Sequence, residues 1–321
     1  MISWETLLSP VILFFALGAL AALARSDLAI PEPLAKGMSL YLMAAIGLKG
    51  GVQVTSAGVH TDMLIAILTG VGLSLFIPLP VFAVLRRFAK LDRINAAAVA
   101  AHYGSVSVVT FVTGVEVLTA LGQAPAGYMV AVLALMESPA IIVGLMLARD
   151  RTDQNAAATG RGHWHETLLN GSVVLLVGSF VIGLIAGKQG MVTIAPVFDT
   201  AFRGVLCLFL LDMGLIAARR LREARAITAR LALLAVVFPA LNGSIGVLLG
   251  TVLGLDAGSA ASLGMLAGSA SYIAVPAVMR LTLPKADPGL YIGMSLGITF
   301  PVNVLCGIPF FIFLANRLAS A

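Results

Sequence analysis

The sequence predicts an all-α integral membrane protein of about ten transmembrane helices, arranged as two inverted five-helix repeats. Three observations predict this class: a shortage of polar residues, long runs without charge, and a second half that repeats the first. Of the 321 residues, 60% are hydrophobic and 11% are charged. In a typical soluble domain roughly a quarter of the residues are charged. This chain therefore has too few polar residues to cover a soluble core.

The apolar residues come in long runs without charge, at Leu64–Leu85, Leu231–Leu255 and Leu290–Ala315. Each run reaches the roughly 20 residues that an α-helix needs to cross the hydrocarbon core of a bilayer. A transmembrane β-barrel would show short segments of alternating hydrophobicity instead. The runs therefore predict a helical bundle.

The first span needs its own argument, because Val11 to Ala24 followed by Arg25 imitates the apolar core of a signal peptide. The preceding residues include Glu5 and neither Lys nor Arg, whereas a signal peptide begins with a basic region. We therefore expect a transmembrane helix here. The ten predicted spans are residues 10–24, 36–54, 62–86, 95–121, 128–148, 168–187, 196–217, 228–254, 258–282 and 288–316.

One hydrophilic stretch divides the chain. The segment from Arg149 to Glu166 is rich in Asp, Asn, Thr, Gly and His, a composition typical of a flexible linker. The predicted organisation is a first repeat in residues 1–148, a linker in residues 149–167 and a second repeat in residues 168–321.

Lys and Arg residues set the expected orientation, because short loops rich in them stay in the cytoplasm. With the N-terminus outside, all but four of the 20 Lys and Arg residues fall on the cytoplasmic side; the four are Lys49, Lys188, Arg203 and Arg317. The linker is then cytoplasmic, and both termini face the periplasm or cell exterior. We expect a multi-pass protein of the inner (plasma) membrane. The net charge of +5 thus reflects topology, and we expect no nucleic-acid partner.

The two halves match at a nearly constant shift. Leu91–Ser107 aligns with Leu255–Ser271 at a shift of 164 residues. The identical pairs are Leu91/Leu255, Asp92/Asp256, Ala96/Ala260, Ala97/Ala261, Gly104/Gly268, Ser105/Ser269 and Ser107/Ser271. Because each repeat has an odd number of spans, the second copy enters the membrane from the opposite face. Such inverted repeats are the architecture of many secondary transporters.

We expect the fourth and ninth spans to be interrupted at Gly104-Ser105-Val106-Ser107 and at Gly268-Ser269-Ala270-Ser271. Gly weakens a helix interior, and Ser competes for backbone hydrogen bonds. In inverted repeats the two breaks would cross near the membrane midplane, where each presents a helix N-terminus to a small anion. The hydroxyls of Ser105, Ser107, Ser269 and Ser271 would bind that anion with the adjacent backbone N–H groups. His102, Tyr103 and Tyr272 would support the breaks, His102 as a brace. The alternative is close helix packing through small residues.

A cation site is predicted at Glu137, because an intramembrane carboxylate is costly unless it is paired or functional. Pro139 follows it and would free backbone carbonyls. Thr299 and Asn303 occupy the equivalent place in the second half. Together with Ser138, these residues would offer sodium its preferred oxygen ligands. The alternative for Glu137 is a structural hydrogen bond.

Three more charged residues fall within or near the ends of spans. Glu116 lies one turn from the outer end of the fourth span, where it could reach water. Asp212 and Lys49, on the seventh and second spans, could pair with each other or line the transport path. Cys207 and Cys306 lie in apolar runs, and we assign them neither a disulfide nor a metal.

Four segments resemble the sodium-dependent bicarbonate transporter family. They are Pro31 to Gly51, Ala101-His102-Tyr103-Gly104-Ser105-Val106-Ser107, Met136-Glu137-Ser138-Pro139-Ala140, and Gly268 to Ala277 with the sequence GSASYIAVPA. The resemblance covers the whole chain. It implies sodium-coupled bicarbonate uptake by alternating access, with no organic cofactor. It also implies a core of spans three to five and eight to ten and a gate of spans one, two, six and seven. The resemblance further implies a homotrimer and a PII-like cytoplasmic regulatory protein as a partner.

Two other functions stay open at this point. The dipoles of the helix N-termini would accept another small anion, such as an organic carboxylate, as readily as bicarbonate. An intramembrane enzyme using His102 with Glu116 or Glu137 is a remote alternative, because an enzyme has no need of a second, inverted copy of its site. A channel is disfavoured, because the sequence shows neither a ring of like charges nor a carbonyl-rich filter.

Overall fold

The computed structural model describes residues 10–57, 61–148, 171–223 and 227–320. These residues form helices joined by short turns, with no strand among them. The predicted linker, residues 149–167, lies outside the described residues. The all-helical class expected from composition is confirmed for the described part of the chain.

Helices cover each span predicted in the first half. They are α2 (Pro10–Leu23), α3 (Glu32–Ala57), α4 (Thr61–Phe76), α5 (Pro78–Arg87), α6 (Arg93–Gly104), α7 (Val108–Ala120), α8 (Met129–Met136) and α9 (Pro139–Ala148). Prolines open α5 and α9, because proline lacks the N–H that a continuing helix would need but fits a first turn. The third and fifth spans are therefore each built from two consecutive helices.

The second half follows the same plan with more π-helix. Its elements are α11 (Gly171–Ala195), η2 (Pro196–Thr200), α12 (Phe202–Glu223), α13 (Ala229–Val252), α14 (Ala257–Ala267), α15 (Ala274–Thr282), α16 (Pro288–Ile292), η3 (Gly293–Thr299), α17 (Phe300–Val302), η4 (Asn303–Gly307) and α18 (Ile308–Ala319). The last span is thus one rod in which α- and π-helix alternate. Such π-bulges often occur at functional sites.

One predicted boundary is wrong. Residues 188–195 were expected to be a loop between two spans, but they are helical and continue α11 to Ala195. The chain bends within α11 at Gly187, whose φ of 58° and ψ of −164° are accessible to glycine and costly for other residues. The sequence pattern located the bend but not the helical turns that follow it.

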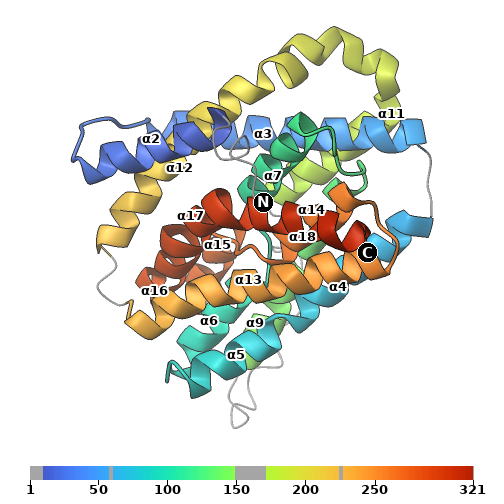
Figure 1. Ribbon diagram of the computed structural model, residues 1–321. Coiled ribbons are helices and arrows are strands. Elements are labelled where there is room, and N and C mark those ends of the chain that lie inside the picture. The colour runs from blue at the N-terminus through green and yellow to red at the C-terminus, as the bar shows by residue number, and fades with distance from the viewer. Residues whose placement is uncertain (1–9, 58–60, 149–170, 224–226, 321) are drawn as a thin grey trace.

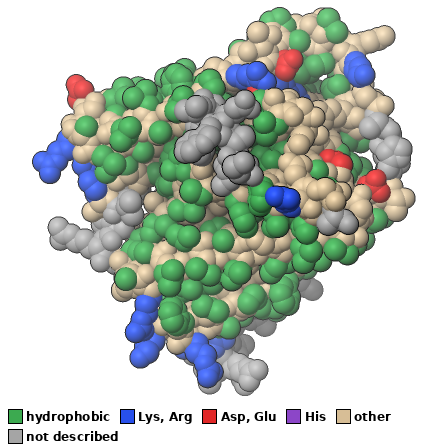
Figure 2. All heavy atoms as spheres, in the orientation of Figure 1, with side chains coloured by type: hydrophobic (Ala, Val, Ile, Leu, Met, Phe, Trp, Pro, Cys, Tyr) green, Lys and Arg blue, Asp and Glu red, His purple; other side chains and the backbone are tan. Residues whose placement is uncertain are grey.

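Six helical stretches among the described residues are long and apolar enough to cross a membrane. They are Thr61–Arg87, Arg93–Ala120, Met129–Ala148, Val174–Arg219, Ala229–Val252 and Pro288–Ala319. Helices α2 and α14 are apolar but shorter. On this face the hydrophobic side chains cover the middle, and Lys and Arg gather at its lower left edge, where α13 begins (Figure 2). The stretches indicate a multi-pass membrane protein.

The helices form two layers (Figure 1). In the four-helix layer, which runs across the top of the picture, α2 packs on α12 and α3 packs on α11. The bundle layer below contains α4–α9 and α13–α18, held together by contacts such as α6 with α9 and α13 with α14. Helix α7 contacts both α14 and α3, so it lies where the two layers meet.

Candidate functional site

The two interrupted helices begin in the same way. The Asp92 side chain accepts a hydrogen bond from the backbone N–H of Asn95 and caps α6. The Asp256 side chain accepts from the backbone N–H of Ser259 and caps α14. A carboxylate at an N-cap satisfies a backbone donor that the helix leaves free. Equivalent residues of the two sequence repeats therefore have the same local role.

Both breaks lie where the sequence predicts them. Helix α6 ends at Gly104, the chain is extended at Ser105 and Ser107, and α7 starts at Val108. In the second half α14 ends at Ala267, and α15 starts at Ala274. The four serines are almost fully buried, with at most 4% of their surface exposed. Non-helical backbone at this depth is tolerated only where protein or a polar cavity surrounds it.

The two breaks bind each other directly. The backbone N–H of Ser107 donates to Ser269 Oγ at 2.9 Å. The backbone N–H of Ser271 donates to the main-chain oxygen of His102 at 2.9 Å. Each break therefore supplies a backbone donor to the other, and the segments predicted to meet do so.

The four hydroxyls fall into two classes. Ser105 Oγ donates to the main-chain oxygen of Glu137 at 2.9 Å, and Ser269 Oγ donates to that of Leu266 at 2.9 Å. Ser107 Oγ instead accepts from the backbone N–H of Thr110, and Ser271 Oγ accepts from that of Val275. Ser107 is thus the N-cap of α7, whereas Ser271 lies two residues before Ile273, the N-cap of α15. Neither hydroxyl donates a well-formed hydrogen bond to a described residue.

The glycines and small residues of the breaks pack tightly. A Cβ atom at Gly104 would lie 2.3 Å from Pro78 Cγ, and one at Gly268 would lie 2.7 Å from the main-chain oxygen of Pro239. Val106 and Ala270, between the serines, are each 2% exposed. The packing interpretation of the small residues therefore holds for the glycines, while the serines make polar contacts.

Replacing either glycine by alanine is expected to destabilise the fold. Gly104→Ala and Gly268→Ala force a methyl group into occupied space, which typically costs about 1–3 kcal/mol. Gly72→Ala is the matched control, because no atom lies within 4 Å of its added Cβ. Thermal unfolding of the purified protein measures the effect. A Gly104→Ala variant as stable as the wild type would contradict the close packing.

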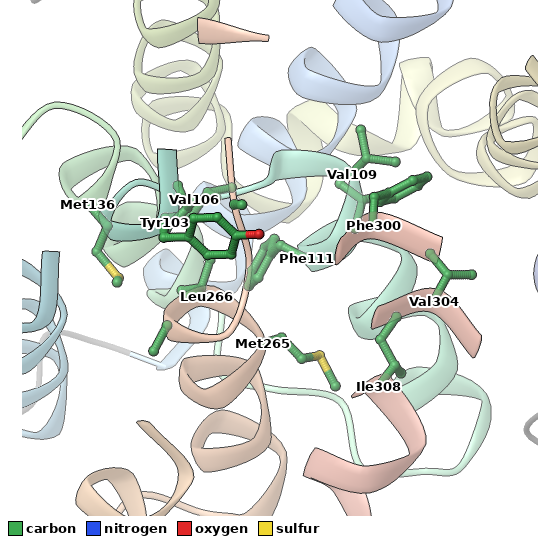
Figure 3. Close-up of a cluster of buried hydrophobic side chains, with 14 of the residues drawn as sticks. Tyr103, Val106, Val109, Phe111, Met136, Met265, Leu266, Phe300, Val304 and Ile308 are labelled. Atoms are coloured by element: carbon green, nitrogen blue, oxygen red, sulfur yellow. The ribbon is translucent and has the colours of Figure 1, made fainter. Parts of the chain in front are cut away.

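Tyr103, Phe111 and Phe300 lie in one buried cluster with Val106 of the first break (Figure 3). Tyr103 is 1% exposed, and its hydroxyl shares a 2.7 Å hydrogen bond with Thr299 Oγ1. The Tyr272 hydroxyl is buried near Ser107 but makes no well-formed hydrogen bond. His102 stacks on Tyr291, and its Nδ1 lies 2.6 Å from the main-chain oxygen of Ala98.

His102 holds the first break from two sides. Its ring bonds the preceding helical turn, and its own carbonyl accepts from Ser271 across the breaks. The bracing role that the sequence suggested has this geometric basis. Its Nε2 is buried without a hydrogen-bond partner among the described residues.

Glu137 lies at the junction of α8 and α9 and is 4% exposed. No described residue donates a hydrogen bond to its carboxylate or forms an ion pair with it. The structural hydrogen bond offered as the alternative is therefore not made by any described residue. Ser138 beside it is half-buried. A buried, unpaired carboxylate is costly, and a bound cation would offset that cost.

The other two predicted cation ligands belong to a second polar cluster. Thr299 Oγ1 donates to the main-chain oxygen of Ala235 at 2.6 Å, and Asn303 Nδ2 donates to that of Gly268 at 2.8 Å. Their side-chain hydrogen bonds among the described residues go to Tyr103, Ala235 and Gly268, and not to Glu137. The four predicted ligands thus fall into two groups that these bonds do not connect.

Two groups that make hydrogen bonds in this region were not predicted from the sequence. Ser74 Oγ donates to the main-chain oxygen of Met136 at 2.8 Å, next to the bond that Ser105 makes. The carbonyl of Ala235 stands four residues before Pro239, which has no N–H to donate to it. The proline inside α13 was the signal for this free carbonyl; nothing local marked Ser74.

Two of the three other charged residues, Lys49 and Glu116, form ion pairs. Lys49 pairs with Asp199 at 2.6 Å, so the pairing with Asp212 that the sequence suggested is wrong. Arg203 of α12 pairs with Glu116 of α7, so Glu116 does more than reach water. Asp212 is 4% exposed, and its Oδ2 has no hydrogen-bond partner among the described residues.

A small cavity lies between the layers, beside the starts of α7 and α15. Its volume of about 10 Å³ corresponds to roughly one water molecule. The lining residues come from α3, α7 and α12 and from the approach to α15: Ser39, Leu42, Met43, Val108, Val109, Val112, Leu206, Phe209 and Ile273. The N-terminal turn of α7 therefore faces this cavity.

Comparison with known protein families gives one match. A protein-family model described as the Na+-dependent bicarbonate transporter superfamily matches residues 10–316. A search of curated proteins finds no match for the chain. The matched range includes both breaks, Glu137 and the cluster around Thr299.

Proposed function

Because the chain belongs to the Na+-dependent bicarbonate transporter superfamily, we propose that it carries bicarbonate into the cell together with sodium. The single observation that best supports this function is the contact between the two breaks. Ser107 and Ser271 bond across it through their backbone N–H groups and keep their hydroxyl protons free for a ligand. Donors from two helix N-termini then converge on one anion.

The proposed anion site lies between Ser107 and Ser271, next to the cavity at the layer boundary. A planar anion with three oxygens can accept from both sides at once, which a single broken helix could not supply. The cavity has room for about one water molecule, so we propose that the layers separate to admit the anion. The four-helix layer would be the gate and the bundle layer the moving core.

Sodium is proposed to bind at Glu137 as the coupling ion. The carboxylate supplies the negative charge, and the half-buried Ser138 hydroxyl stands beside it. The main-chain oxygens of Met136 and Glu137 accept hydroxyls, which fixes the junction around the carboxylate. We propose that Thr299 and Asn303 stabilise the second half of the core by donating hydrogen bonds to the main-chain oxygens of Ala235 and Gly268.

The test of this function is uptake of labelled bicarbonate into proteoliposomes, with and without an inward sodium gradient. We expect accumulation with sodium outside and none with choline in its place. Competition with formate and acetate addresses the second candidate, an organic carboxylate transporter. Uptake of acetate that exceeds uptake of bicarbonate would favour that candidate. Bicarbonate uptake of equal rate without sodium would contradict the coupling.

We further propose that the two halves are inverted five-helix repeats, with both termini outside the cell. In a variant with Cys207 and Cys306 replaced by alanine, cysteine is introduced at Lys90 or at Ser320. Both positions are exposed. An impermeant thiol reagent applied to intact cells should label the Ser320→Cys variant and leave the Lys90→Cys variant unlabelled. The reverse pattern would contradict the orientation.

A further inference from the structure

Two buried hydroxyls donate to consecutive main-chain oxygens at the junction of α8 and α9. Ser74 Oγ bonds the oxygen of Met136 at 2.8 Å, and Ser105 Oγ bonds the oxygen of Glu137 at 2.9 Å. Each serine is at most 1% exposed. Helix α8 ends at Met136 and α9 begins at Pro139, and side chains bond the carbonyls at this junction. The two bonds are alike in type, length and burial.

The two serines belong to different parts of the molecule. Ser74 stands within α4, a continuous helix. Ser105 stands in the first break, two residues before Ser107, which faces the proposed anion. One hydrogen bond and two peptide units therefore connect the anion site to the backbone of the proposed sodium ligand. Ser74 fixes the same junction without any connection to a break.

The donors of Ser105 are already engaged. Its backbone N–H donates to the main-chain oxygen of Ala101 at 3.1 Å, and its hydroxyl donates to Glu137. The residue therefore has no proton to offer a bound anion in this structure. Its hydroxyl serves the link between the break and the carboxylate-bearing junction.

From this geometry we propose that Ser105 is a positioning residue that couples sodium binding to bicarbonate binding. The inference rests on the proposed function. Bicarbonate at Ser107 fixes the first break, the Ser105 hydroxyl holds the Glu137 backbone, and the carboxylate is thereby aimed at sodium. Sodium at Glu137 fixes the break for bicarbonate by the same bond, because coupling between two sites is reciprocal.

The test uses three purified full-length proteins: the wild type, Ser105→Ala and Ser74→Ala. For each, the bicarbonate dissociation constant is measured calorimetrically in sodium and in choline, and the ratio of the two is the coupling factor. Coupling factors in proteins are typically about 5 to 150. We expect Ser105→Ala to lower the factor at least about fivefold and Ser74→Ala to leave it within about twofold of the wild type.

Affinity for bicarbonate in choline separates coupling from direct binding. It should be nearly the same in Ser105→Ala as in the wild type, because the Ser105 hydroxyl is not an anion donor. An unchanged coupling factor in Ser105→Ala, or equal losses in both variants, would overturn the inference. A wild-type factor of one would instead contradict the sodium coupling itself. If Ser105→Ala does not fold, Ser105→Cys keeps the volume with a weaker donor and is judged by the same criteria.

Discussion

Ser107→Ala and Ser271→Ala are each expected to weaken bicarbonate binding roughly five- to a hundredfold. Each substitution removes a hydroxyl proton that no described protein group accepts and that the proposed anion would. A hydrogen bond to a charged group contributes about 1–3 kcal/mol, and a tenfold change in affinity corresponds to about 1.4 kcal/mol. Because one residue comes from each break, both halves should matter.

Ser107 also caps α7, so Ser107→Ala is expected to cost about 1 kcal/mol of stability as well. Ser107→Gly separates the two effects, because glycine in place of serine at an N-cap costs only a few tenths of a kcal/mol. Ser271→Gly is its counterpart in the second break. The glycine variants should bind bicarbonate as weakly as the alanine variants. Ser262→Ala is a further control, because this buried hydroxyl of α14 has no partner among the described residues.

Calorimetric titration with bicarbonate measures the dissociation constant of each of the five variants. If substitutions in only one half weaken binding, the shared site is wrong and the second break is a packing element. If the substitutions in both breaks lower the melting temperature and leave the affinity for bicarbonate unchanged, both breaks are packing elements.

Glu137→Gln should raise the sodium concentration for half-maximal uptake about thirtyfold or more. Losing one partner of a buried charge pair costs about 2 kcal/mol or more, and tenfold in affinity is about 1.4 kcal/mol. The substitution also removes a buried charge that no described residue pairs with. The sodium-free variant should therefore be at least as stable as the wild type.

Two measurements check Glu137. Sodium should raise the melting temperature of the wild type, because a ligand that binds only the folded state stabilises it, and this shift should vanish in Glu137→Gln. Uptake gives the half-maximal sodium concentration. Glu116→Gln is the matched control, since Glu116 is paired with Arg203 and should leave sodium dependence unchanged. An unchanged sodium dependence in Glu137→Gln would remove this residue from the cation site.

Much of the fold follows from periodicity and composition. Apolar runs of spanning length predicted the helices, and the paired GSxS segments predicted both interruptions. Glycine and serine each weaken a helix, and the paired GSxS segments combine them at matched positions of the two halves. The loop expected at residues 188–195 failed because Gly187 alone makes the bend, after which the chain resumes a helix.

The sequence predicted that the two breaks lie together, but not which hydrogen bonds their serine hydroxyls make. The sequence treated four serines alike, whereas in the structure the Ser105 and Ser269 hydroxyls donate to carbonyls, and the Ser107 and Ser271 hydroxyls accept from backbone N–H groups. This division depends on which carbonyls lie nearby, and Ser105 reaches a carbonyl 32 residues away. Lys49 likewise found Asp199 instead of Asp212, because the packing of α11, η2 and α12 decides which charges meet. Long-range contacts of this kind leave no local pattern.

The central claim is that sodium and bicarbonate occupy one protein cooperatively, and the most direct measurement is the affinity for bicarbonate at two sodium levels. Purified protein is titrated with choline bicarbonate at fixed alkaline pH, in sodium chloride and in choline chloride. The account predicts tighter binding in sodium, by roughly fivefold or more. It also predicts that sodium binds more tightly, by the same factor, when bicarbonate is present. Equal bicarbonate affinity in the two salts would contradict it.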